Sequence, residues 1–319
     1  GREHMKWVYT SQRKEYANAL VEIGMARTDV VVLDADLSSS TRTVEFAKKF
    51  PERFFNVGIA EQNLMGTAAG LAVSGKTVFA STFAVFATGR CWDQVRQSIA
   101  YPNINVKIVA THAGITVGGD GASHQALEDI GLMSILPNMC VIVPSDGIEA
   151  YKAVKAAAER PGPCYVRMGR ADVPMVTTVD SPFTIGKATV LKEGPDVTLV
   201  GCGRMVAVCM DAAEELKKKG IEAEVVNMST VKPLDEDTLI RSARKTGCVV
   251  TAEEHSVRSG LGSAVASALS ENHPVPLMKV GTPDCFGESG ESNDLMCRYG
   301  LTAEHIVASA EEVIRRKRA

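Results

Sequence analysis

The chain has 319 residues, 45% of them hydrophobic, and a formal net charge of −3. Because single hydrophobic cores stop growing near about 250 to 300 residues, this length favours two domains. The basic residues are scattered apart from a run at 315–318, so we expect no nucleic-acid partner. No apolar stretch reaches the roughly 20 residues of a membrane span, and we find no hydrophobic signal core. These features predict a soluble, cytoplasmic protein without a membrane segment.

Eight cysteines occur without any CxxC pair, and most of them lie in apolar, strand-like runs. Buried free thiols in a reducing cytosol are therefore expected. The first residues, 1–5, look like a cloning remnant before a start methionine, and we exclude them from the fold prediction.

Short β-rich runs alternate with helical patterns through the first half of the chain. Strands are predicted at 30–33, 77–80, 106–110, 141–143 and 165–167. Helices are predicted at 11–27, 41–50, 61–74, 84–100, 124–135 and 146–159. Such alternation is typical of a mostly parallel sheet with helices on both faces.

The pattern changes over residues 171–186, where two prolines interrupt a stretch without helical period. We interpret it as a linker and predict domains at 6–175 and 191–319, joined by 176–190. A second alternation follows, with strands at 197–200, 224–226, 249–251 and 277–280 and helices at 204–219 and 302–317. The predicted fold class is α/β, with two domains that are each a mostly parallel sheet flanked by helices.

Glu61 stands at the head of an apolar, small-residue run, 64–73, that is typical of a buried helix. An unpaired carboxylate there would be costly to desolvate. Either this charge faces water or a partner waits for it.

His112 directly follows a predicted strand, and ligand sites in α/β sheets gather at the carboxyl ends of strands. The glycine-rich loop 118–125 suits close approach of a ligand, although an ordinary turn with Ser123 as a helix cap is the alternative. His124 lies across that loop, and two histidines flanking one flexible loop favour a functional site. Their spacing is not that of metal ligands, so zinc is not expected.

Phe83 and Phe86 follow another predicted strand, where they could form a stacking wall for a flat ring or simply pack in the core. For Arg13, Arg167 and Arg170 the default is a solvated or ion-paired surface role. Arginine also suits bidentate capture of a phosphate, so a binding role stays open.

Taken together, these segments resemble the second half of transketolases. The resemblance is carried, in the family's order, by GIAEQN (58–63), STFAVF (81–86), THAGITVGGDGASHQALEDI (111–130), VPSDGIEA (143–150) and VKPLD (231–235). It runs from about residue 8 to the end and covers the family's pyrimidine-binding and carboxyl-terminal domains. That family uses thiamine diphosphate to move a two-carbon ketol unit from a ketose phosphate to an aldose phosphate, as in the pentose phosphate pathway.

The resemblance implies catalytic roles for Glu61 and His124. Glu61 would face N1′ of the cofactor's aminopyrimidine, where a shared proton favours the imino tautomer. Phe86 would stack on that ring with Phe83 beside it. Asp120 would read a hydroxyl of the donor sugar, and His124 would hydrogen-bond or relay a proton to substrate hydroxyls.

The resemblance also implies a binding site for the substrate phosphate. Its members would be Arg13, Ser40, His112 and Arg170. Guanidinium, imidazole and hydroxyl groups are all good phosphate partners, so the implied set fits the chemistry.

The departure from the family pattern is large. Full-length transketolases begin with a domain that holds the diphosphate through Mg²⁺, using Gly-Asp-Gly followed by an Asn. The only match, 119–121, lies in the sugar-facing loop without a suitable Asn downstream, so we expect no metal on this chain. The resemblance therefore implies a subunit of a split transketolase. A separate amino-terminal subunit would complete the active site and hold most of the Mg²⁺ contacts, and a homodimer core within a heterotetramer is expected.

Three alternatives stay open. The chain could be the beta chain of a 2-oxoacid dehydrogenase, but the sugar and phosphate residues would have no role with pyruvate. It could be half of a 1-deoxyxylulose-5-phosphate synthase, although that family has a shorter loop between STF and DQV. It could also be a non-catalytic scaffold subunit, against which the intact Glu61, Phe86 and His124 argue. The preferred sugar pair is not predicted.

Overall fold

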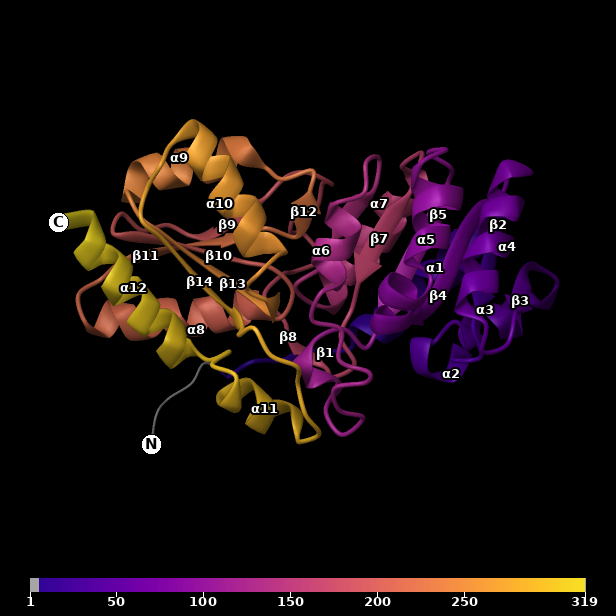
Figure 1. The fold of residues 1–319 in the computed structure, drawn as a ribbon, viewed down its shortest axis with the longest axis horizontal. Helices are drawn as coiled ribbons and strands as arrows, with labels where there is room; N and C mark the ends of the chain where they lie inside the picture. The colour runs from indigo at the N-terminus through magenta and orange to yellow at the C-terminus, as the bar shows by residue number, and fades with distance from the viewer. Residues whose placement is uncertain (1–5, 319) are drawn as a thin grey trace.

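The computed structural model describes residues 6–318 and holds two large sheets that lie side by side (Figure 1). The predicted cloning remnant lies outside the described residues. Seven strands form the first sheet in the order β12-β6-β7-β5-β4-β2-β3, and five form the second in the order β14-β13-β10-β11-β9. A two-stranded ribbon of β1 and β8 lies between them. The predicted α/β class with two sheets is confirmed.

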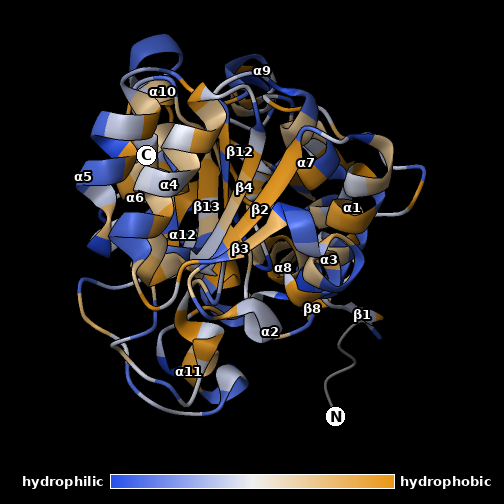
Figure 2. Ribbon diagram, turned by 90° about the vertical axis from the view of Figure 1, so that its right-hand side faces the viewer, coloured by the Kyte–Doolittle hydropathy of each residue, from blue (hydrophilic) through white to orange (hydrophobic). Residues whose placement is uncertain are grey.

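The first sheet is mostly parallel. Its strands are β2 (Val30–Asp34), β3 (Phe54–Asn56), β4 (Thr77–Phe83), β5 (Val106–Thr111), β6 (Cys140–Ile142), β7 (Cys164–Arg167) and β12 (Thr230–Lys232). Only β12 pairs antiparallel within it, against β6. Every residue of β2, β4 and β5 is buried, because helices cover both faces of the sheet. Figure 2 shows this apolar interior flanked by helices with polar outer faces.

The helices that connect these strands are α1 (Gln12–Ala26), α2 (Ser38–Thr41), α3 (Val44–Lys49), η1 (Pro51–Arg53), α4 (Glu61–Val73), η2 (Phe86–Arg90), α5 (Trp92–Gln94), η3 (Val95–Ala100), η4 (Ile115–Val117), α6 (Asp129–Ser134) and α7 (Gly147–Glu159).

Three of the helices predicted from the sequence are wrong in detail. Helix 41–50 divides because Arg42 adopts a left-handed φ of 71°. Helix 84–100 consists of two π-helical turns around a short α-helix, interrupted at Cys91. Residues 124–128 form a loop instead of a helical turn.

The second sheet is parallel except at one edge. Its strands are β9 (Thr189–Lys192), β10 (Val197–Gly201), β11 (Ala223–Asn227), β13 (Val249–Ser256) and β14 (Leu277–Thr282), with β9 antiparallel to β11. Its helices are α8 (Met205–Lys218), α9 (Glu236–Thr246), α10 (Leu261–Asn272), α11 (Ser292–Arg298) and α12 (Ala303–Arg318). Of these helices, the sequence pattern predicted only α8 and α12.

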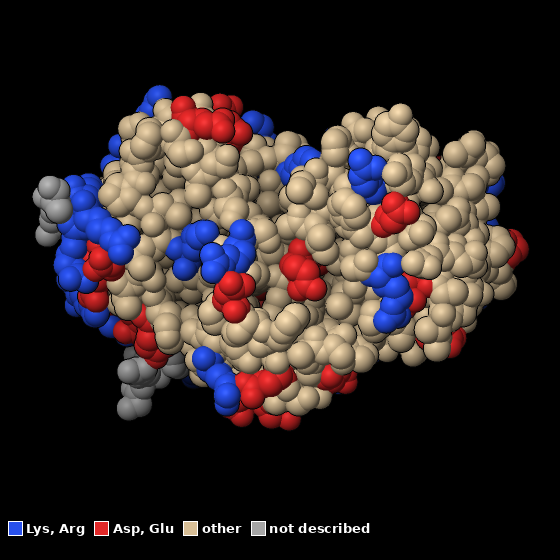
Figure 3. Space-filling model, viewed as in Figure 1, with Lys and Arg blue, Asp and Glu red and all other residues tan. Residues whose placement is uncertain are grey.

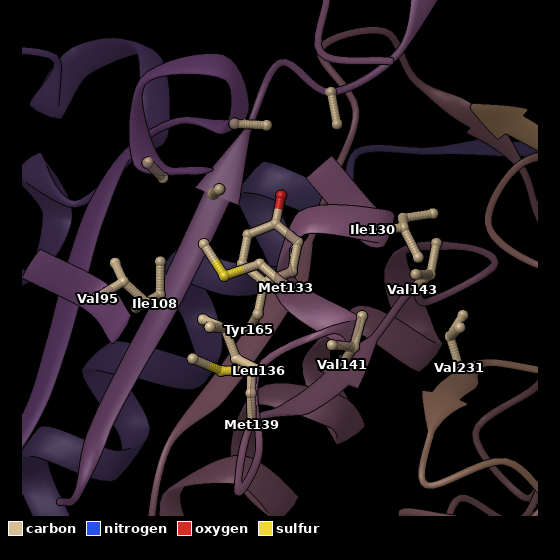
Figure 4. Packing of buried hydrophobic residues seen from close by; sticks show 14 of the residues in the cluster. Val95, Ile108, Ile130, Met133, Leu136, Met139, Val141, Val143, Tyr165 and Val231 are labelled. Carbon is tan, nitrogen blue, oxygen red and sulfur yellow. The ribbon is translucent and has the colours of Figure 1, made fainter. Parts of the chain in front are cut away.

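Residues 171–186 are not wholly irregular, because β8 (Val173–Pro174) pairs with β1 (Tyr9–Thr10), which also belongs to the first half of the chain. The two halves are joined through β12, which extends the first sheet, and Figure 4 shows its Val231 near Val141 and Val143 in the core. The predicted boundary at 176–190 stays a prediction, but the second half clearly contributes to the first sheet.

The cysteines are all free thiols, six of them buried, as the sequence predicted, while Cys285 and Cys297 are exposed. On the face seen in Figure 3, acidic and basic side chains are interspersed, with the densest group of Lys and Arg at the end where α12 lies. Across residues 6–318, no helix combines the length and apolar character needed to cross a bilayer.

Candidate active site

Four neighbouring strands of the first sheet, β7, β5, β4 and β2, end at one edge. A predicted site residue stands at or just beyond the end of each strand: Arg170 after β7, His112 after β5, Phe83 at the end of β4, and Ser40 after β2. Carboxyl ends of parallel strands are where open α/β sheets bind ligands. The topology therefore gathers segments that are far apart in the sequence.

Aromatic rings form the centre of this edge. The Phe83 ring stacks on the His112 imidazole, with centroids 3.7 Å apart, and lies 5.9 Å from the Phe86 ring. The His124 imidazole meets Phe86 edge-on at 5.4 Å. Phe83 is buried whereas Phe86 keeps part of its surface exposed. Phe83 thus packs in the core, and Phe86 offers a ring to the outside.

His112 is buried and held in an unusual backbone conformation. It is 3% exposed, has a positive φ of 60°, and its Nδ1 lies 2.9 Å from the Thr111 hydroxyl. Burial, followed by the charges of Arg13 and Arg170, lowers the pKa of His112 to about 3. The imidazole is therefore neutral near pH 7 and can hydrogen-bond a ligand without carrying charge.

Two arginines of the expected phosphate site, Arg13 and Arg170, lie close enough to His112 for their charges to act on it. Arg13 Nη1 donates to the backbone carbonyl of Ser40 at 2.8 Å, and Arg170 Nη1 donates to the carbonyl of Val117 at 2.8 Å. Burial, then the charges of Arg42 and Arg170, lowers the pKa of Arg13. The Arg13 Nε is buried without a hydrogen-bond partner. Like charges and an unsatisfied donor in one place make this cluster suited to an anion.

A groove of about 910 Å³ opens next to the cluster, along α1 and α3. Its lining includes Arg13, Lys14, Arg42, Lys48 and Lys49, with Asp172 as one of its acidic members. The groove also contains Glu22 and Glu45, so the cationic cluster is reached from solvent along a wall of mixed charge in which basic residues outnumber acidic ones.

Glu61 begins α4 and is only 3% exposed. The sequence showed no partner for it, but the fold provides one. Arg90 Nη1 donates to Glu61 Oε1 at 2.9 Å, and the Arg90 Cζ lies 4.4 Å from the centroid of Phe86. Sequence reasoning missed Arg90, because a π-helical turn that brings an arginine back to α4 has no simple periodic signal.

The loop between β5 and α6 carries Asp120 and His124, and the second half of the chain braces it. Gly114 has a φ of 83°, and a Cβ there would lie 2.3 Å from Glu254 Oε1. That carboxylate accepts hydrogen bonds from the Thr116 amide and hydroxyl, both at 2.7 Å. A side chain at Gly114 would therefore displace Glu254 from its hydrogen bonds to Thr116, and it would also strain the backbone.

Contacts with the second half of the chain also hold this loop at Gly121 and Gln125. Gly121 has a φ of 73°, and a Cβ there would lie 2.5 Å from the Ser289 hydroxyl. Gln125 Nε2 donates to the carbonyl of Glu288 at 2.8 Å. Asp120, at the tip, is exposed. Long-range contacts such as these could not be found from local sequence patterns.

Arg167 does not lie on the surface, which corrects the default given to it from the sequence. It is 6% exposed, and its Nε donates to Asp129 Oδ2 at 2.7 Å. Tyr165 donates to the same oxygen at 2.6 Å, and Arg167 Nη2 donates to the carbonyl of Glu254 at 2.9 Å. Burial, the largest single influence, favours the neutral acid, but the charges of Arg167 and His255 and the hydrogen bonds from Arg167 and Tyr165 together lower the pKa of Asp129. Arg167 is thus part of the scaffold behind the site.

The residues fit a flat ring that carries N–H donors. Glu61 is a buried acceptor, Phe86 is a partly exposed face beside it, and a planar guanidinium already makes both contacts. Within residues 6–318, no group of three or more His, Cys, Asp or Glu side chains could hold a metal ion.

Comparison with known proteins identifies the family. Residues 9–175 match the transketolase pyrimidine binding domain, and residues 186–306 match the transketolase C-terminal domain. The chain therefore belongs to the transketolase family, whose members are thiamine diphosphate-dependent transferases.

Relatives of similar length include subunits of divided enzymes. The chain is 48% identical to a putative transketolase C-terminal section from Methanocaldococcus jannaschii, over 97% of this chain and 98% of the relative. It is 45% identical to a 6-deoxy-6-sulfo-D-fructose transketolase subunit from a Clostridium species, over 96% and 95%. A solved split gene transketolase, described as an inactive beta4 tetramer, has 56% identity and a TM-score of 0.91, over 97% and 99% of the two chains.

Proposed function

We propose that this chain is the carboxyl-terminal subunit of a two-chain, thiamine diphosphate-dependent transketolase that moves a ketol unit between sugar phosphates. The observation that carries the proposal is the convergence at one sheet edge of a buried carboxylate, Glu61, a partly exposed ring, Phe86, and a cationic cluster around His112. Ketol transfer between sugar phosphates needs a seat for a flat cofactor ring and an anion site within reach of it.

The cofactor ring would be held by Glu61 and Phe86, with Phe83 packed behind Phe86. When bound, thiamine diphosphate supplies the nucleophilic carbon that the reaction requires. Glu61, in a nearly dry place, can share a proton with a ring nitrogen, and His124 lies beside Phe86 where it can hydrogen-bond a reacting hydroxyl. We assign the Mg²⁺ and the diphosphate mainly to the amino-terminal subunit.

The substrate phosphate would bind between Arg13 and Arg170. Their fixed guanidinium groups, the unsatisfied Arg13 Nε and the neutral His112 imidazole supply donors for its oxygens. Ser40 would add its hydroxyl, and exposed Asp120 would read a hydroxyl of the donor sugar.

A separate amino-terminal subunit would complete each site. A relative called a C-terminal section and a solved split-gene enzyme support this reading. The assembly would be a heterotetramer built on a homodimer of this chain. Because the solved relative forms an inactive tetramer, we expect this chain alone to assemble without turnover. The relative that acts on a sulfosugar leaves the preferred sugar pair to experiment.

Reconstitution tests the proposal. The purified chain should show negligible cleavage of xylulose 5-phosphate, and the addition of an amino-terminal subunit, thiamine diphosphate and Mg²⁺ should restore it. Robust turnover by the single chain would refute the two-chain proposal. Pyruvate decarboxylation faster than ketol transfer would favour the 2-oxoacid dehydrogenase alternative.

Arg170→Ala tests the phosphate site. In the reconstituted enzyme it should raise the KM for phosphorylated sugars much more than for an unphosphorylated donor, because only the former loses a charge-assisted hydrogen bond. Arg244→Ala, an exposed arginine on α9, is the matched control and should change neither value. Equal effects of Arg170→Ala on both donors would place the phosphate elsewhere.

A further inference from the structure

Arg90 contacts both Glu61 and Phe86, yet the proposed function gives it no role. It ends the π-helical turn η2, and the carbonyl of Arg90 accepts a hydrogen bond from Gln62 Nε2 of α4 at 3.3 Å. Its guanidinium makes two contacts at once, an ion pair with Glu61 at 2.9 Å and a stack on Phe86 at 4.4 Å from Cζ to the ring centroid. The backbone of Arg90 is thus fixed near Glu61, while its side chain covers both Glu61 and Phe86.

These two contacts are those that the proposed function gives to an aminopyrimidine. A guanidinium is planar and delocalised, carries N–H donors along its edge and stacks on aromatic faces. An aminopyrimidine ring shares these features: a flat face for Phe86 and an edge that hydrogen-bonds to Glu61. Both groups cannot stack on the same face of Phe86 and meet the same carboxylate oxygen.

The geometry of Arg90 permits it to leave. Its side chain is 50% exposed, whereas the Glu61 side chain is 4% exposed. The residue before it, Gly89, has open space around its Cβ position, so nothing crowds the turn from that side. Departure of Arg90 exposes the Glu61 carboxylate to water or to another planar donor, and the lost ion pair and ring contact are the modest cost that keeps the pair closed.

We infer that Arg90 takes the place of the aminopyrimidine when no cofactor is bound and exchanges with the cofactor ring on binding. Arg90 is then a positioning residue: it keeps Glu61 and Phe86 in their binding arrangement and competes with the ligand for both. The inference rests on the proposed function, since it presumes that the ring binds at Glu61.

Thiamine, which carries the aminopyrimidine without the diphosphate, is the probe for the full chain by itself. The affinity of the chain for thiamine, measured by titration calorimetry, should rise roughly 5- to 30-fold in Arg90→Ala. In this variant, thiamine no longer has to displace a half-exposed ion pair and a cation–π contact before it binds. Arg90→Lys keeps the charge but not the planar group and should give an intermediate affinity. Arg96→Ala, an exposed arginine in η3, is the matched control and should leave the affinity unchanged.

A merely structural Arg90 would have the opposite effect, because loosening the site would weaken thiamine binding in Arg90→Ala. Equal or weaker binding by both Arg90 variants would overturn the inference while leaving the proposed function standing. Absence of thiamine binding in Arg90→Ala would also overturn the inference, because removal of the Arg90 side chain would not have made the site available to thiamine. The proposed function is judged separately, by turnover with the amino-terminal subunit.

Discussion

Two buried carboxylates of this protein are paired with arginine, and the two pairs differ in what surrounds the cation. Asp129 meets Arg167 in the scaffold, where both side chains are almost fully buried. Glu61 meets Arg90 at the sheet edge, where the carboxylate is buried but the arginine is half exposed. The same two functional groups at nearly the same distance thus stand in different dielectric environments.

The difference separates architecture from function. Asp129 also accepts from Tyr165, and Arg167 also donates to two backbone carbonyls, so each charge is fixed by several bonds. Arg90 is held at Glu61 by one ion pair and one ring contact, and water reaches it. A pair with an exposed cation can exchange its partner for a ligand, whereas a fully buried pair cannot.

The largest effect is expected from breaking the scaffold pair. Arg167→Ala leaves the Asp129 carboxylate buried without its cation and should lower the free energy of unfolding by about 3 to 5 kcal/mol. Urea denaturation of the full chain measures it. A loss below about 1 kcal/mol would mean that the pair behaves like an ordinary surface pair. Arg167→Lys, which keeps the charge, serves as the comparison should Arg167→Ala fail to fold.

Glu61→Gln should separate catalysis from stability. The amide keeps the shape and a hydrogen-bond acceptor for Arg90 but removes the ionisable proton site. In the reconstituted enzyme, turnover should fall about 100-fold or more, the usual range for a proton-transfer group. The melting temperature of the chain should stay close to that of the wild type. A nearly wild-type rate would end the catalytic assignment of Glu61.

His112 is about as buried as the two carboxylates, but it faces the cations Arg13 and Arg170. Its pKa of about 3 in the folded chain compares with about 6.5 in the unfolded chain. Below pH 6.5 the unfolded chain therefore takes up a proton that the folded chain refuses. The contribution of neutral His112 to stability is complete above pH 6.5 and is lost as pH falls toward 3.

Denaturation curves at two pH values test this. Between pH 7 and pH 5, His112→Gln should lose up to about 2 kcal/mol less stability than the wild type. Inorganic phosphate, bound between the two arginines, should reduce the wild-type loss, because it offsets their charge. Identical pH dependence in the wild type and the variant would show that the folded chain also protonates His112 in this range.

Arg90→Ala should lower the free energy of unfolding by only about 1 kcal/mol, much less than Arg167→Ala, because the lost cation is half exposed and water can solvate Glu61 afterwards. The same denaturation experiment as for Arg167→Ala measures it. A loss as large as that of Arg167→Ala would show that both pairs are part of the scaffold, and the contrast between them would disappear.

The sequence pattern located most of the buried parallel strands, because their apolar runs are continuous and bounded by helical patterns. It did not find β12, which is short and gains its stability from pairing with β6, a strand almost 90 residues earlier. It also extended α6 backward over 124–128, where the braces at Gly121 and Gln125 hold a loop. Tertiary contacts outweighed local propensity at both places.

Among the candidate site residues, those that follow strands were the easiest to predict. His112 and Phe83 stand at the carboxyl ends of strands, where open α/β sheets usually bind ligands, whereas a binding role for Arg170 came only from the family resemblance. The roles proposed for them, and for Ser40 and Asp120, await the experiments above. Arg90 and Glu254 escaped the sequence because each acts through a partner that is distant along the chain.

By itself the sequence determined the α/β class and the family resemblance, and it predicted the sheet edge at which we expect the site, because these depend on hydrophobic period and on motif order. Only the tertiary structure decided how each charge is compensated. Whether an arginine stabilises the scaffold or can be displaced from a binding site by a ligand depends on how much water reaches the arginine. Solvent access is a property of the packed chain. Glu61 shows this most directly: the sequence left open whether its charge faces water or a partner, and the fold buries it against Arg90.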